Sequence, residues 1–111
     1  MSRDEFESLI GPIESLLTSV GFSQIRNERD GAFGSHYAEF ADDKNAYRIV
    51  WDGKDSWLAG EYCGNYGASE TFSWNDVAIY RAGRYASSMD LRAFGGQLVE
   101  ALRAHLASHA A

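Results

Sequence analysis

Hydrophobic residues recur at helical spacing near both ends of the chain. In the first segment they follow intervals of three and four residues, which is typical of an amphipathic helix. Ser2 and Glu5 have the spacing of a capping box, and Gly21 stands where a left-handed C-terminal cap is expected, followed by Phe22. Ser87 or Ser88 opens the second helix. The two stripes are Phe6, Leu9, Ile10, Ile13, Leu16, Leu17 and Val20, and then Leu91, Phe94, Leu98, Val99, Leu102 and Leu106.

Each stripe is interrupted by residues that disfavour helices. Gly11-Pro12 lies within the first, and proline both removes an amide donor and crowds the preceding turn, so we expect a kink or a new helix start there. The unbroken stripe favours the kink. Gly95-Gly96 lies within the second, where each glycine costs about 1 kcal/mol relative to alanine. We expect a bulky side chain, a Trp or Tyr of the sheet, to pack against this pair.

The residues between the helices alternate as strands do. Residues 46–51 form the best strand, with Tyr47, Ile49 and Trp51 on one face and Arg48 on the other. Asp52-Gly53-Lys54-Asp55 predicts a hairpin turn, because Asp-Gly supplies positive backbone angles. Gly60 in the returning strand indicates a bulge or close packing. The other elements expected are strands over 22–30, 36–40 and 56–63, a short edge strand over 70–72 and a short helix over 73–83.

This order predicts an α+β fold: an antiparallel meander sheet of three to five strands, with the N-terminal and C-terminal helices packed on one face. Residues 1–111 form one domain, since the chain has an ordinary single-domain length and no linker. The other sheet face, which carries Arg48, Asp52 and Glu61, is expected to be open to water or to a partner.

Composition narrows the function classes. The net charge is −6, and without a cluster of Lys and Arg we expect no binding of nucleic acid. No segment is apolar enough to span a membrane. The absence of a signal peptide predicts a cytoplasmic protein. The single cysteine, Cys63, excludes an intrachain disulfide.

Few residues point to catalysis or to a metal. His105 and His109 have the spacing of half a zinc motif, but Leu106 replaces the expected glutamate. Cys63 with His36 would form a nucleophile pair only if they met in space, and a buried structural thiol is the commoner case. The paired aspartates lie in predicted turns, where such side chains usually cap amides. We therefore expect no catalytic residue, no metal and no cofactor.

The chain is rich in aromatic residues, with three Trp, six Tyr and six Phe. Rings that reach the surface beside carboxylates would suit a protein partner. Rings that fill the core are the simpler explanation. The candidate partner-binding residues are Asp52, Asp55, Trp57, Glu61, Tyr62 and Tyr66.

Four segments are similar to small uncharacterised bacterial α+β proteins: Val20-Gly21-Phe22, Phe33-Gly34-Ser35, the strand Tyr47–Trp51 and the hairpin to Trp57. The resemblance spans residues 16–63. Some proteins of that type are immunity partners of toxins, so it implies a non-enzymatic domain that covers a basic protein surface, and it assigns no catalytic residue.

An alternative is a small enzyme or ligand-binding domain, with a pocket between sheet and helices where His36, Tyr62 or Arg48 converge. A homodimer paired through its sheet faces is compatible with either function.

Overall fold

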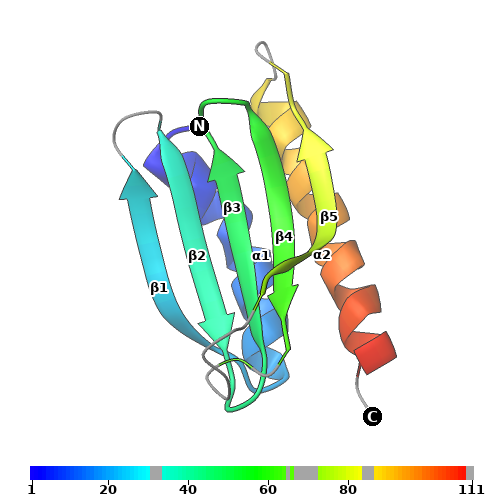
Figure 1. Ribbon diagram of the computed structural model, residues 1–111. Coiled ribbons are helices and arrows are strands. Elements are labelled where there is room, and N and C mark those ends of the chain that lie inside the picture. Colours follow the sequence, from blue (N-terminus) through cyan, green and yellow to red (C-terminus); the bar gives the residue numbers. More distant parts are fainter. Residues whose placement is uncertain (31–33, 65, 67–72, 84–86, 110–111) are drawn as a thin grey trace.

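The computed structural model describes residues 1–30, 34–64, 66, 73–83 and 87–109. The elements are α1 (Arg3–Ser19), β1 (Ser23–Asp30), β2 (Ser35–Ala41), β3 (Ala46–Asp52), β4 (Trp57–Cys63), β5 (Asn75–Arg81) and α2 (Ser88–His109). The five strands form one antiparallel sheet in sequence order, which confirms the meander. Both helices lie on the same face of that sheet, α1 behind the β1–β3 half and α2 behind β4 and β5 (Figure 1).

The caps of α1 follow the sequence closely. Ser2 and Glu5 form the predicted capping box, in which each side chain accepts the other's backbone N–H. At the other end Gly21 has a φ of 98°, and the amides of Gly21 and Phe22 donate to the carbonyls of Thr18 and Leu17. This is the Schellman arrangement, and it turns the chain directly into β1. Pro12 lies inside a helix that continues past it.

The core lies between the helices and the sheet. Five residues of the first stripe and three of the second are buried, and Val20 at the end of α1 is half exposed. The sheet supplies the other wall through alternate residues of β2, β3 and β4. The fully buried side chains of this wall include His36, Phe40, Tyr47, Ile49 and Leu58.

Two glycines bring α2 close to its neighbours. A Cβ on Gly60 of β4 would lie 2.6 Å from Leu98 Cδ1, so Gly60 marks both the predicted close packing and a register shift toward β5. Gly95 faces Leu9 of α1, whose Cγ would lie 3.0 Å from an added Cβ. The expectation of a Trp or Tyr at this point was wrong. The two helices contact each other directly, and α1 supplies the neighbour of Gly95.

The short helix expected over 73–83 is a strand, β5. Val77, Ile79 and Tyr80 all favour strands, and the free edge of β4 pairs in register with six of the seven residues of β5. A seven-residue helix would leave most of its terminal groups unpaired. The edge strand expected over 70–72 lies outside the described residues.

The β3–β4 hairpin is present, but its geometry differs from the prediction. The residue with positive φ is Ser56, at 55°, rather than Gly53. The Asp52 side chain accepts the amides of Lys54 and Asp55, each at 2.9 Å. The connection is therefore a four-residue loop instead of the tight two-residue turn. The Asp52 carboxylate stabilises the loop by accepting these two backbone amides.

Within the described ranges, neither helix is long and apolar enough to cross a membrane.

Candidate functional site

The sheet face opposite the helices, called the open face, presents side chains in rows that run across the strands. One row is apolar and consists of Tyr37, Val50, Ala59 and Ile79, in register from β2 to β5. The next row is charged and consists of Arg26, Glu39, Arg48, Glu61 and Asp76. The rows are two residues apart along β2, β3 and β4, as the alternation of side chains requires, and three apart along β5, where the register shifts.

The apolar row is covered only in part. Val50 and Ala59 in its centre are buried, whereas Tyr37 is half-buried and Ile79 is 44% exposed. Trp57, at the start of β4, is half-buried and lies two residues before Ala59 on the same face. Together they form an apolar surface with an aromatic ring toward each side, the composition found at the centre of protein interfaces.

The charged row is organised around Arg48. Its guanidinium makes a two-point contact with Glu61, with Nη2–Oε2 at 2.9 Å and Nε–Oε1 at 3.3 Å. The same guanidinium lies 4.3 Å from the ring centroid of Trp74, within the range of a cation–π contact. Arg48 is thus fixed in position by a carboxylate and a ring.

Tyr66 and Trp74 come from the connection between β4 and β5, and the described stretch that leads into β5 crosses in front of the sheet (Figure 1). The Tyr66 hydroxyl donates to Glu39 Oε2 at 3.3 Å, and its amide donates to the carbonyl of Lys44 at 2.7 Å. Burial and the neighbouring Glu39 raise the pKa of Tyr66, which keeps its hydroxyl a donor. Glu39 is only 6% exposed. Tyr66 and Trp74 therefore cover part of the charged row, whereas Ile79 of the apolar row is 44% exposed.

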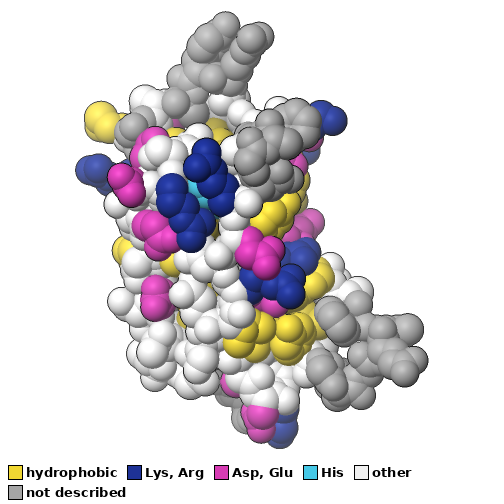
Figure 2. Space-filling model, turned by 90° about the vertical axis from the view of Figure 1, so that its left-hand side faces the viewer, with side chains coloured by type: hydrophobic (Ala, Val, Ile, Leu, Met, Phe, Trp, Pro, Cys, Tyr) yellow, Lys and Arg dark blue, Asp and Glu magenta, His cyan; other side chains and the backbone are white. Residues whose placement is uncertain are grey.

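A small hollow of about 180 Å³ lies where the two rows meet β1. It is lined by Arg26, Glu28, Tyr37, Glu39 and Arg48. Seen from the β1 edge, basic and acidic side chains are interspersed over this side of the molecule (Figure 2). The hollow is smaller than the 300–1,000 Å³ of usual small-molecule pockets, so it suits one side chain of a partner better than a whole substrate.

Three of the six residues predicted to bind a partner lie on the open face. Trp57 borders the apolar row, while Glu61 belongs to the charged row and Tyr66 covers part of it. Asp52 and Asp55 lie at the adjacent hairpin turn, where Asp52 is occupied by the turn amides. Tyr62 points to the helix side, as its strand parity predicts. Its hydroxyl donates to Asn45 at 2.8 Å, and its side chain lies on the other side of the sheet from Trp57 and Glu61.

No protein-family model, curated protein or solved structure matches this chain. The role of the open face must therefore be inferred from its geometry.

The residues expected to converge in an enzyme pocket lie apart. His36 is buried beneath the start of α1, where its Nε2 lies 3.1 Å from the carbonyl of Met1. Arg48 is on the open face, and Tyr62 is at the far end of the sheet beside α2. Cys63 is buried in the row beyond the charged one, and burial raises the pKa of its thiol. The pairing of Cys63 with His36 is absent, since they project from opposite faces.

The two histidines near the end of α2 share a face, as their spacing predicts. Their rings are stacked with centroids 3.9 Å apart, and His105 Nδ1 lies 2.7 Å from the hydroxyl of the buried Tyr47. Burial, and then the nearby His109, lowers the pKa of His105, so it is neutral at physiological pH. No group of three metal-ligating side chains occurs among the described residues.

The apolar row was missed at the level of sequence, because Tyr37, Val50 and Ile79 belong to three different strands. Strand parity places Tyr37 on the other sheet face from His36, and Val50 on the other face from Trp51. The face of each residue could therefore be predicted strand by strand. Their common row depends on register, and Ile79 had been assigned to a helix.

Proposed function

We propose that this chain is a non-enzymatic protein-binding domain of the immunity type, whose open face covers a basic surface of a partner protein. The observation that carries the proposal is the partly exposed apolar row, flanked by Trp57 and bordered by charges that are already fixed. Aromatic anchors in a surface of this kind supply most of the binding energy of protein interfaces.

The charge of the open face supports a basic partner. Among its described side chains and those of the adjacent β3–β4 turn, carboxylates outnumber cations. The carboxylates are Glu28, Glu39, Asp52, Asp55, Glu61 and Asp76, and the cations are Arg26, Arg48, Lys54 and Arg81. The whole chain carries −6. Such an excess speeds the approach of a positively charged protein and makes the rate depend on salt.

The internal bonds of the charged row favour binding over catalysis. Arg48 and Glu61 neutralise each other, and the Glu39 carboxylate accepts from Tyr66. A catalytic acid or base needs a substrate proton within reach beside a pocket. Here the same groups hold the sheet surface and the residues that cover it in one arrangement, which reduces the entropy lost when a partner binds.

The test is affinity capture from lysate of the source cell, with Trp57→Ala and Met89→Ala compared with the unaltered chain. Met89 is a matched control, because it is an exposed apolar side chain on α2, away from the open face. We expect the same basic protein with the unaltered chain and with Met89→Ala. Trp57→Ala should weaken its binding roughly 30-fold, the effect of losing about 2 kcal/mol at a hot spot.

Two results would count against the proposal. One is a partner that Trp57→Ala retains at full strength although the variant is folded. The other is the recovery of a small metabolite without any protein. Light scattering separates the remaining case, in which a second copy of the chain occupies the apolar row and Trp57→Ala converts a dimer to a monomer.

A further inference from the structure

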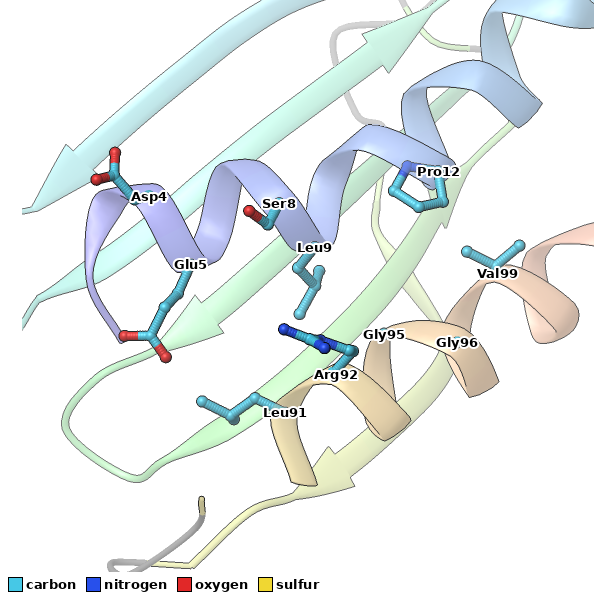
Figure 3. A pocket seen from close by; sticks show the side chains of 10 residues that line it. All are labelled: Asp4, Glu5, Ser8, Leu9, Pro12, Leu91, Arg92, Gly95, Gly96 and Val99. Atoms are coloured by element: carbon cyan, nitrogen blue, oxygen red, sulfur yellow. The ribbon is translucent and has the colours of Figure 1, made fainter. Parts of the chain in front are cut away.

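A second candidate site lies on the other side of the molecule, between α1 and α2. A groove of about 540 Å³ runs between the helices, and the described residues that line it all belong to these two helices (Figure 3). Its volume falls within the range of small-molecule sites. The groove is separate from the open face, because the sheet lies between them.

The unusual helix residues of the sequence meet in this groove. Pro12 lines it, and because proline has no N–H, the carbonyl of Ser8 lacks its helical donor. Gly95 allows Leu9 to approach α2 closely, but an added Cβ on Gly96 would meet no atom within 4 Å. Packing within the chain therefore explains Gly95 and leaves Gly96 unexplained. What Gly96 does provide is open space along the groove.

Among the described residues of the groove, Arg92 is a basic side chain without an ion-pair partner. Arg92 reaches across the gap beside Leu9 and Leu91 (Figure 3), and it forms no ion pair or hydrogen bond with the described part of the chain. The two acidic residues nearby are not aimed at it. Asp4 points away from α2 in Figure 3, and Glu5 is held by the capping box.

We propose that this groove binds a small molecule with an apolar chain and one carboxylate. The apolar chain lies against Leu9, Leu91 and Val99, in the space that Gly96 leaves open. The carboxylate pairs with the guanidinium of Arg92, which can donate two parallel hydrogen bonds to it. The volume of the groove lies in the range of small-molecule sites, which favours a small ligand over a peptide.

Decanoate is the probe, with decanol as its uncharged counterpart, and binding is measured by calorimetry and by chemical shifts of α1 and α2 amides. The unaltered chain should bind decanoate saturably and more tightly than decanol. Arg92→Gln should weaken decanoate binding about tenfold, the loss of one charge-assisted interaction, and leave decanol binding unchanged.

Gly96→Leu tests the space itself. Leucine is a better helix former than glycine and meets no neighbour at Cβ, so this variant should have a higher Tm while losing at least tenfold in affinity for decanoate. Gln97→Leu, which adds the same side chain to an exposed position outside the groove, should bind as the unaltered chain does.

The proposal fails if decanoate does not saturate the unaltered chain, or if Gly96→Leu binds it as well as Gln97→Leu does. It also fails if Arg92→Gln changes decanoate and decanol binding equally. Because Gly96→Leu is expected to be the more stable protein, unfolding cannot account for its loss of binding.

Discussion

Gly60→Ala tests the closest contact between the sheet and α2. The added Cβ would lie 2.6 Å from Leu98 Cδ1 and 3.6 Å from Leu102 Cδ2. Ordinary carbon contacts lie near 3.5–4.0 Å, so Leu98 or the strand must move by about 1 Å. Both leucines are fully buried, and a close-packed core resists that movement.

Overpacking of this kind costs about 1–3 kcal/mol. The loss of a glycine from the unfolded chain returns about 0.4–1 kcal/mol, so we expect a net destabilisation of about 1–2 kcal/mol. For a domain of this size, each kcal/mol lowers Tm by roughly 4 °C or more. Leu98→Ala alone should cost about 2–5 kcal/mol because it leaves a cavity. In that background Gly60→Ala should cost nothing.

The assay is urea unfolding at 25 °C followed by tryptophan fluorescence, for the two single variants and the double variant. The expected coupling energy between the positions is about 1–2 kcal/mol, which is the cost of Gly60→Ala in the unaltered chain minus its cost in the Leu98→Ala background. Gly96→Ala is the control on the same helix, because its Cβ meets no atom within 4 Å, and it should stabilise the chain by about 0.5–1 kcal/mol. If Gly60→Ala costs the same with and without Leu98, the close contact is not the cause and the reasoning is refuted.

Two further predictions concern polar groups. Arg48→Met should cost about 1–3 kcal/mol in urea unfolding, because the Glu61 side chain, only 14% exposed, loses its partner. Adding Glu61→Gln should recover part of that loss, and no recovery would mean that the pair is not responsible. The second concerns acid stability. Burial lowers the pKa of His105 from 6.5, so the unfolded state binds the proton more readily. The unfolding free energy should be constant above about pH 6.5 and fall as the pH drops through that value toward the lower folded pKa. His105→Gln should flatten this slope in unfolding curves measured from pH 7.5 to 5, apart from the share due to His36, whose pKa burial also lowers. An unchanged slope in His105→Gln would contradict the assignment.

Local signals predicted most of the fold. The capping box at Ser2 and Glu5 and the cap at Gly21 depend on residues close together in sequence, and the helix stripes depend on spacing alone. The connection at Ser56 was harder, because one carboxylate, that of Asp52, decides the turn by accepting two amides. β5 was missed since its strand form depends on the free edge of β4, a tertiary partner that overrides local capping signals.

The candidate sites show the same limit. Trp57 and Glu61 were placed on one face by parity alone, and Tyr62 on the other. The apolar row needed the register of four strands, which no single segment contains. The groove needed the packing of α1 on α2: Pro12 and Gly96 are 84 positions apart by residue number, and only the fold shows that they line the same space.

The order of the strands has a consequence for how the chain folds. Each strand pairs with its neighbour in sequence, so every step of sheet formation closes only a short loop, and such loops cost little entropy. The contact between α1 and α2 instead joins two helices that are separated in sequence by all five strands. We expect it to form last, so substitutions in that seam should accelerate unfolding while leaving the folding rate nearly unchanged.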